Sequence, residues 1–386
     1  MWSRLATARL QSLATSFPAV LVLGARQVGK TTLVRTTFRG TPYVDLEDPA
    51  TRGLFRDDPR FQIEAKAKDR LILDEAQFVP ELFSVLRGLI DAQRRRMGRF
   101  IILGSAQPSL VHAVSESLAG RVGILDLDPL TAAEVATGRQ RRPHQEVWLR
   151  GGFPDALSHD FRDWWEAYLR TYLERDLPAL GVKADPILMR RLLTMLAHAQ
   201  GGLLNSKQLG ASLGVSNHTI GRYLDILEQT YLLRRLPPYF RNVGKRLVKS
   251  PKAYLRDSGL LHHLLNIESH ETVDSHPVRG ASWETFIIED VIRRERLRHP
   301  HSQFFFWRTA AGAEIDLVVE RGSERFAIEV KSGRGDNVRA VRALAAAATD
   351  IQAKRSYLID QQKDSSRVAP QVERRGFSTS LNWLPE

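Results

Sequence analysis

Short apolar segments alternate with amphipathic segments in the first third of the chain. The apolar segments are residues 19–23, 71–73 and 100–103, each followed by polar residues, and helical spacing is found at 61–68 and 81–94. Strands that are apolar on both faces and alternate with helices are typical of a parallel sheet that helices cover on both sides. Such sheets bind ligands at the carboxyl ends of their strands. The pattern predicts a doubly wound α/β domain over residues 1–129.

The chain changes character from about residue 130. We expect a helical lid or linker at 130–180, because aromatic side chains recur at helical spacing there. Residues 181–268 are helix-rich with a short hairpin, and residues 269–386 are predicted to form a second α/β domain. The elements expected in that last domain are a helix at 282–297 and strands at 304–307, 314–319 and 327–330.

A glycine-rich turn that contains a lysine follows the first apolar strand. Residues 24–31 read Gly-Ala-Arg-Gln-Val-Gly-Lys-Thr and match the pattern G-x-x-x-x-G-K-[ST] in full. Backbone N–H groups of such a loop surround a phosphate, and the lysine reaches the β- and γ-phosphates. We therefore expect a P-loop NTPase sheet that binds ATP, with Thr31 as a ligand of Mg²⁺. The expected nucleotide-binding residues are Gly24, Ala25, Arg26, Gln27, Val28, Gly29, Lys30, Thr31 and Thr32.

An acidic pair closes the strand at 71–73. Asp74 is placed to hold Mg²⁺ through water, and Glu75 is placed to polarise the attacking water. Ser105 follows the strand at 100–103 and is predicted to sense the γ-phosphate. Together with Lys30 these residues form the predicted catalytic set, and Gln77 and Gln107 are weaker candidates.

Arg121, at the end of the segment Ser-Leu-Ala-Gly-Arg, has two interpretations. It could neutralise charge in the transition state as a further catalytic residue, within its own chain or across the subunit boundary of a homo-oligomer. Alternatively, it could form an ion pair that anchors the lid. The sequence leaves both interpretations open.

Residues 205–229 have the pattern of a helix–turn–helix, and a winged-helix domain is expected around them. The second helix would expose Asn217, His218 and Arg222 towards DNA, and residues 231–236 and 239–248 would form the wing. Seven basic residues and no acidic residue lie between positions 234 and 252. This basic run predicts contacts with phosphates, in which we include Arg241, Lys245, Arg246 and Lys249. The alternative is a winged helix that serves as a scaffold with solvated basic residues.

The last region contains the D…E-x-K arrangement of restriction-type nucleases. Asp316 lies on one predicted strand, Glu329 and Lys331 lie on the next, and the preceding helix supplies Glu284 as the better of two carboxylates. In such a site the carboxylates hold Mg²⁺ and the lysine helps to activate water. A degenerate domain that only binds DNA would show the same residues, so nuclease activity stays open.

The motifs together resemble a family of bacterial and archaeal AAA-type P-loop ATPases that carry a C-terminal domain of unknown function, number 4143. The resemblance covers about nine tenths of the chain and implies ATPase activity together with a restriction-nuclease-like α/β fold in the last domain. It is carried by the segments GARQVGKTTL, YVDLEDP, LILDEAQ, LGSAQ, SLAGR, YLRTYLERDL, KSPKAYLRDSGLLHHL, WETFIIED and AEIDLVVE…FAIEVKSG.

Composition narrows the possible functions further. The chain of 386 residues has no cysteine, which excludes disulfides, thiolate zinc sites, iron–sulfur clusters and a cysteine nucleophile. The formal net charge of +12 is compatible with nucleic-acid binding. The longest early apolar segment, 19–23, is too short to cross a bilayer and no signal peptide is visible, so we expect a cytoplasmic protein without a membrane partner.

Two functional hypotheses follow. The first is a Mg²⁺-dependent ATPase whose cycle alters the grip of the winged-helix and nuclease-like domains on DNA. The second is an ATP-driven switch or adaptor that binds a protein partner and has an inert C-terminal domain. Stimulation of ATP turnover by DNA would separate them.

Overall fold

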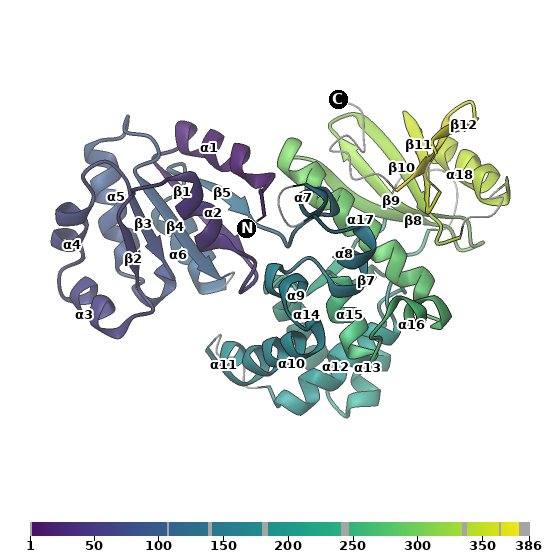
Figure 1. Cartoon of the computed structure of the whole chain (residues 1–386), viewed down its shortest axis with the longest axis horizontal. Helices are drawn as coiled ribbons and strands as arrows, with labels where there is room; N and C mark the ends of the chain where they lie inside the picture. Colours follow the sequence, from purple (N-terminus) through teal and green to yellow (C-terminus); the bar gives the residue numbers. More distant parts are fainter. Residues whose placement is uncertain are drawn as a thin grey trace. The chain divides into compact units, whose positions relative to one another are not determined.

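The chain forms two compact units. The computed structural model describes residues 2–105, 108–137, 141–179, 184–240, 247–333, 338–362 and 364–377. The first unit comprises residues 3–130 together with 229–231, and the second comprises 131–228 and 232–386 (Figure 1). Three of the four predicted domains, 130–180, 181–268 and 269–386, therefore lie almost entirely within the second unit.

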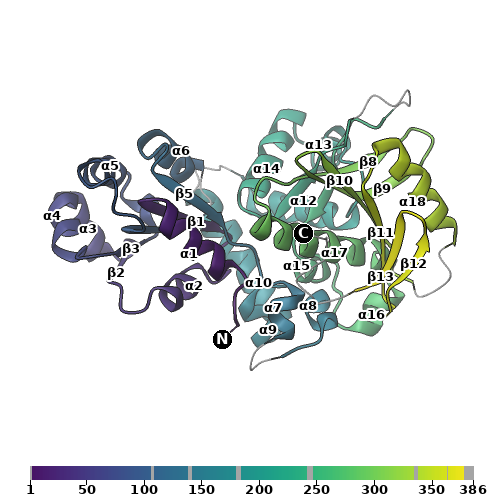
Figure 2. The ribbon, with the colours of Figure 1, turned by 90° about the horizontal axis from the view of Figure 1, so that it is seen from above.

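The first unit is built around a five-stranded parallel sheet of the order β2-β3-β4-β1-β5. Helices α1 and α2 lie on one face of the sheet, and α5 and α6 lie on the other (Figure 2). Its elements are α1 (Ala6–Ser16), β1 (Ala19–Gly24), α2 (Lys30–Thr37), β2 (Tyr43–Asp45), α3 (Pro49–Asp57), α4 (Pro59–Lys66), β3 (Leu71–Asp74), the 3₁₀-helix η1 (Ala76–Phe78), α5 (Leu82–Ala92), β4 (Phe100–Ser105), α6 (Pro108–Ser117) and β5 (Val122–Asp126).

The three strands predicted from apolar runs are confirmed as β1, β3 and β4, which occupy the middle of the sheet and are buried along almost their whole length. The sequence does not predict β2 and β5, which form the two edges. β2 has only three residues, and β5 alternates between covered and exposed positions. An edge strand covered on one side carries a weaker hydrophobic signal than a central strand.

The second unit begins with a helical region that is rich in aromatic side chains. Within the stretch predicted as a helical lid or linker, α10 continues into a turn of π-helix, and Trp165 packs against Phe153 and Tyr168. The elements of this region are α7 (Ala132–Ala136), α8 (His144–Arg150), α9 (Pro154–Ser158), α10 (Phe161–Thr171), η2 (Tyr172–Asp176), α11 (Leu177–Ala179), α12 (Pro186–His198), α13 (Ser206–Leu213), α14 (Asn217–Gln229), β6 (Leu233–Leu236), β7 (Lys252–Leu255), α15 (Ser258–Leu264) and α16 (His270–Ser275).

Helices α13 and α14 are joined by the short turn that the sequence predicts. Gly214 ends α13 with φ +70°, a conformation in which glycine carries little strain. The Ser216 hydroxyl accepts a hydrogen bond from the backbone N–H of Thr219 at 3.1 Å, as expected of a residue that caps the next helix.

The predicted wing is wrong in its strand pairing. Among the described residues, β6 pairs antiparallel with β7, from Leu233 with Leu255 to Leu236 with Lys252; residues 241–246 of the predicted wing lie outside the described part of the chain. The segment between β6 and β7 instead meets the last sheet, because Pro238 bridges to Phe306 and Leu247 bridges to Thr309. The Pro-Pro turn therefore directs the chain to another sheet edge and does not close a hairpin.

A mixed six-stranded sheet ends the chain, in the order β12-β13-β11-β10-β9-β8. Helices α17 and α18 pack against it, and α18 supplies Leu344, Ala347 and Ile351 to its core. The elements are α17 (Arg279–Arg298), β8 (Gln303–Arg308), β9 (Glu314–Arg321), β10 (Glu324–Val330), α18 (Val338–Ile351), β11 (Arg355–Asp360), β12 (Ser366–Ala369) and β13 (Val372–Gly376), which confirm the predicted helix and three strands.

A buried charge cluster on α17 fastens this helix to the β6–β7 pair. The Glu289 carboxylate accepts hydrogen bonds from Arg234 on β6, at 3.0 Å for Nη2, and from Nε of Arg256 at 3.3 Å. Burial alone would raise the pKa of Glu289, but the charges of the two arginines outweigh burial and hold the pKa well below its usual range.

We predict that Glu289→Gln lowers the free energy of unfolding by about 3–5 kcal/mol, because it leaves two buried guanidinium groups without their counter-charge. Urea unfolding followed by tryptophan fluorescence measures the change. Glu64→Gln is the matched control: it removes one partner of an exposed pair with Arg60 and should cost less than about 1 kcal/mol. Equal effects of the two substitutions would contradict the prediction.

Candidate functional site

The loop between β1 and α2 has the geometry that phosphate binding requires. Gly24 lies so close to the main chain of Leu127 that a Cβ atom would come within 2.4 Å of its carbonyl oxygen. Gly29 has φ +94° and directly precedes α2. The loop therefore passes close to Leu127 at Gly24, adopts a left-handed conformation at Gly29 and presents the amino end of a helix, where backbone N–H groups favour anions.

Lys30 lies over this loop as predicted. Its side chain is buried, and Nζ donates hydrogen bonds to the carbonyl oxygens of Gly24 at 3.1 Å and Ala25 at 2.9 Å. The ammonium group is thus held at the mouth of the turn, where a phosphate can replace the weaker carbonyl acceptors.

Thr31 and Asp74 meet although 43 residues separate them in sequence. The Thr31 hydroxyl donates to Oδ2 of Asp74 at 2.7 Å, and the Tyr43 hydroxyl donates to the same oxygen at 2.8 Å. Two oxygen donors side by side next to a phosphate-binding loop fit the ligand preference of Mg²⁺, which takes few protein ligands when phosphates supply the others. The sequence analysis did not select Tyr43. The one signal that could have pointed to it is its position on β2, the strand that pairs with the strand of Asp74.

Glu75 is connected to Ser105 through Gln77. Gln77 Nε2 donates to the Glu75 carboxylate and, at 3.3 Å, to the Ser105 hydroxyl. Burial raises the pKa of Glu75, and the nearby Lys30 opposes this shift. Gln77, a weaker candidate in the sequence, is therefore the residue that joins the two stronger ones. Gln107 lies outside the described residues.

Arg121 does not lie at the nucleotide loop of its own chain. Its carbonyl oxygen accepts a hydrogen bond from Ala19, the first residue of β1, whereas the loop begins at Gly24. At about 3.3 Å per strand residue, the two ends of β1 are roughly 16 Å apart. The side chain makes a two-pronged ion pair with Asp91 on α5 at 2.8 and 2.9 Å. The predicted catalytic role within one chain is therefore wrong, and the ion pair lies within the first unit and not at a lid.

The predicted DNA-facing residues of α14 are exposed. Asn217, His218 and Arg222 all lie on the surface of the second unit. Lys249 is also exposed, while Arg241, Lys245 and Arg246 lie outside the described residues.

Three other members of the basic run are used inside the protein, which corrects the interpretation of that run. Arg234 is buried against Glu289, and Arg235 pairs with Asp225 and Glu228 on α14. Lys252 is only 3% exposed. Arg234 and Lys252 are buried against internal carboxylates, and Arg235 is engaged by two partly exposed acids of α14, so none of the three offers a freely exposed charge to a phosphate.

The carboxylates predicted for a nuclease site do converge. Glu284 on α17 and Asp316 on β9 lie near each other, and Glu314 joins them although the sequence analysis did not select it. Glu329 faces the same group: burial and the charge of Asp316 raise its pKa to about 8, and the same two causes raise the pKa of Glu284 to about 7. The register of β8 on β9 shifts opposite this stretch, and such irregularities re-aim side chains.

Two lysines neutralise part of this carboxylate cluster. Lys331 Nζ donates to Oε1 of Glu329 at 2.6 Å, whereas Lys252 Nζ lies among the other three carboxylates. Burial alone would lower the pKa of Lys252, but these carboxylates raise it above its usual range, so the side chain stays charged. Within the described part of the chain, no group of three or more Asp, Glu or His side chains is arranged to hold a metal ion. Lys252 and Lys331 already contact these carboxylates, so a divalent cation would have to compete with two ammonium groups for them.

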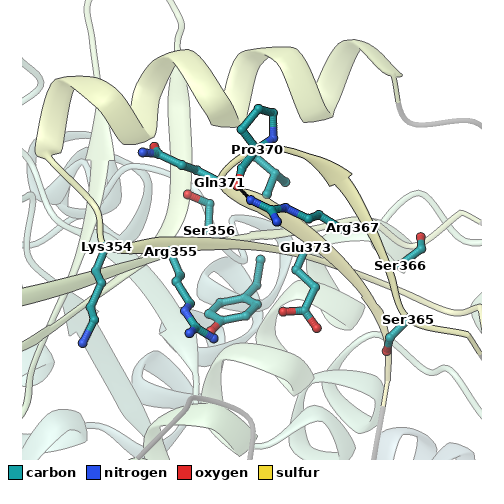
Figure 3. Close-up of a pocket in the computed structure, with 11 residues that line it drawn as sticks. Lys354, Arg355, Ser356, Ser365, Ser366, Arg367, Pro370, Gln371 and Glu373 are labelled. Carbon is teal, nitrogen blue, oxygen red and sulfur yellow. Dashed lines mark hydrogen bonds between the residues drawn. The ribbon is translucent and has the colours of Figure 1, made fainter.

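A separate cavity of about 540 Å³ lies beside β11, β12 and β13 (Figure 3). Lys354, Arg367 and Glu373 line it together with Ser356, whose buried hydroxyl has no hydrogen-bond partner. None of the residues discussed for the nucleotide loop or the carboxylate cluster lines this cavity.

None of the described helices combines the length and the apolar character needed to cross a membrane.

Known protein families match three consecutive segments of the chain. Residues 16–136 match the AAA domain, residues 141–271 match a domain of unknown function (DUF8612), and residues 279–373 match a domain of unknown function (DUF4143). The middle match falls on the region where the sequence predicts a winged helix.

Two mycobacterial proteins are similar to most of the chain. The uncharacterized proteins Rv2008c of Mycobacterium tuberculosis and Mb2031c of Mycobacterium bovis are each 40% identical over 362 residues, which cover 92% of this chain and 79% of theirs. Among solved structures, the Walker-type ATPase paby2304 of Pyrococcus abyssi aligns with 69% of this chain and 96% of its own, at 16% identity and a TM-score of 0.48. The predicted family is confirmed: the chain belongs, with these mycobacterial proteins, to the AAA-type P-loop ATPases that carry the C-terminal domains DUF8612 and DUF4143.

Proposed function

We propose that the protein is a Mg²⁺-dependent ATPase that converts ATP and water to ADP and phosphate and couples this cycle to DNA binding. The observation that carries the ATPase part is the bond between Thr31 and Asp74 at 2.7 Å, because it joins the phosphate-binding loop to the acidic end of β3. Lys30 and Glu75 complete the arrangement from the same two elements.

Each residue of the site has a distinct task in this proposal. The loop N–H groups and Lys30 bind the β- and γ-phosphates, and Thr31 and Asp74 hold Mg²⁺, which neutralises phosphate charge when it is bound. Glu75 orients the attacking water and accepts its proton, since its carboxylate lies beyond the end of β3. Gln77 and Ser105 connect this carboxylate to β4, so a change at the γ-phosphate can reach a second strand.

The α13–α14 pair supports the DNA part of the proposal. Two helices joined by a tight turn, with Asn217, His218 and Arg222 exposed at the second helix, fit a helix–turn–helix that enters a DNA groove. In this proposal the β6–β7 pair corresponds to the hairpin of a winged-helix fold, and the six-stranded sheet corresponds to the sheet of a restriction-nuclease-like domain.

The switch or adaptor hypothesis also has an observation in its favour. Arg234 and Lys252 balance internal carboxylates and Arg235 pairs with acids of α14, so three of the seven basic residues expected on a DNA surface are already neutralised by the chain itself. In that version α14 binds a protein partner and the last domain is inert. A homo-oligomer in which Arg121 reaches a neighbouring subunit is compatible with either version.

We predict that Lys30→Ala abolishes or severely weakens ATP hydrolysis, because the phosphates lose their cationic partner. Glu75→Gln should keep nucleotide affinity and slow turnover by at least about 100-fold, as expected when a general base is lost. Phosphate release and the binding of a fluorescent ATP analogue measure the two effects. Lys66→Ala, which changes an exposed lysine of the same unit, is the matched control and should behave as the unmodified protein. Unchanged turnover in Lys30→Ala would refute the ATPase proposal.

We predict that duplex DNA binding weakens with salt and depends on the α14 face. Arg222→Gln and Lys249→Gln should each flatten the slope of log affinity against log salt by about 0.9 if each residue contacts one phosphate. The same substitution at Arg241, Lys245 and Arg246 tests the rest of the basic run, and Arg60→Gln in the first unit is the control. Fluorescence anisotropy gives the slopes, and ATP turnover with and without DNA gives the coupling. The adaptor hypothesis would be favoured if these substitutions leave the affinity for DNA unchanged and DNA does not stimulate ATP turnover.

A further inference from the structure

The carboxylate cluster of the last sheet surrounds a positive charge that the chain itself supplies. Lys252 Nζ lies 2.6 Å from Oε1 of Glu314, 3.2 Å from Oε1 of Glu284 and 3.6 Å from Oδ1 of Asp316. The Lys252 side chain is 4% exposed, and it approaches from β7, outside the sheet that carries two of these acids. The ammonium group is therefore enclosed by three carboxylates from two different elements.

The surroundings of the lysine side chain complete a shaped site for an ammonium group. The rings of Tyr254 and Phe306 lie 5.9 and 5.7 Å from Nζ, a distance at which an aromatic face attracts a cation. The Tyr254 hydroxyl also donates to Oε1 of Glu284 at 2.6 Å. Aromatic walls and an oriented carboxylate suit a large monovalent cation better than a small divalent ion, which requires oxygen ligands in near-octahedral geometry.

A divalent cation and this ammonium group compete for the same carboxylate oxygens. Mg²⁺ would have to lie about 2.1 Å from oxygens that already contact Nζ, so the two charges would be separated by only a few ångströms. On the remaining carboxylate, Glu329 Oε1 accepts from Lys331 at 2.6 Å and Oε2 has no hydrogen-bond partner, while Asp316 Oδ2 accepts from the backbone N–H of Val330 at 2.9 Å. A divalent ion held by Glu329 Oε2 and Asp316 would therefore lie close to both Lys331 and Lys252.

We propose that Lys252 is the resident cation of this cluster and that it closes the last domain to divalent metal ions. The cluster then binds the ammonium group of Lys252. This contact joins β7, in the region matched by DUF8612, to α17 and β9, in the region matched by DUF4143. A metal-dependent nuclease activity is excluded while Lys252 is in place. This proposal does not depend on the ATPase assignment.

Manganese binding to the full-length chain tests the proposal. All proteins carry Thr31→Ala, so that the nucleotide site does not contribute, and Mn²⁺ binding is followed by electron paramagnetic resonance without nucleotide. With Lys252 present, Asp316→Asn should leave Mn²⁺ binding unchanged. Lys252→Met should strengthen Mn²⁺ binding at least about tenfold, since it removes a unit charge at close range. Adding Asp316→Asn to Lys252→Met should abolish that gain.

Two results would overturn the proposal. One is Mn²⁺ binding by the chain with Lys252 intact that disappears in Asp316→Asn. The other is a folded Lys252→Met protein that gains no Mn²⁺ binding. If Lys252→Met does not fold, Mn²⁺ binding by the chain with Lys252 intact can still be compared with and without Asp316→Asn, and this comparison decides whether the cluster holds a metal ion. A second test is DNA cleavage in Mn²⁺. Cleavage by the chain with Lys252 intact that is lost in Glu329→Gln would refute the proposal.

Discussion

Charge removed from water must be matched by opposite charge, and the second compact unit is organised around this constraint. Glu289 is enclosed by Arg234 and Arg256, and Lys252 is enclosed by Glu284, Glu314 and Asp316. A buried ion that loses its partner costs several kcal/mol, so each pairing fixes the position of the elements that supply it. Both networks use α17 on one side and the β6–β7 pair on the other. The helix is therefore held by hydrogen-bonded charges as well as by its apolar face.

The nucleotide site follows the same constraint with a different outcome. Lys30 is buried over carbonyl oxygens, and Asp74 accepts from two hydroxyl groups. Neutral acceptors and donors satisfy these ions less well than a phosphate and a metal ion would. The site is thus built for ligands that carry charge, whereas the carboxylate cluster of the last sheet already contains its counter-charge. The nucleotide site is therefore suited to bind and release charged ligands, whereas the charges of the carboxylate cluster stabilise the fold.

The first unit could be predicted largely from the sequence, and the reason is that its signals are local. The phosphate loop lies in one continuous segment, and β1, β3 and β4 are central strands with continuous apolar runs. The partners of a charged side chain are different, because they depend on which distant elements meet. Nothing near Lys252 in the sequence indicates Glu314, and nothing near Arg121 indicates Asp91. The basic run therefore has the composition of a nucleic-acid surface although Arg234 and Lys252 are buried and Arg235 is paired with acids of α14.

The two buried networks also limit how the second unit can move. A rotation of the β6–β7 pair against α17 would have to break the bonds of Glu289 and those of Lys252 at once. Each break would expose an unpaired charge to a poorly solvated interior, at a cost of about 3–5 kcal/mol. Helix α14 is tied to β6 by ion pairs of Arg235 with Asp225 and Glu228, which are partly exposed and therefore cost less to break. Motions of the second unit that keep β6, β7, α17 and β9 in their mutual positions are accordingly favoured over motions that separate them.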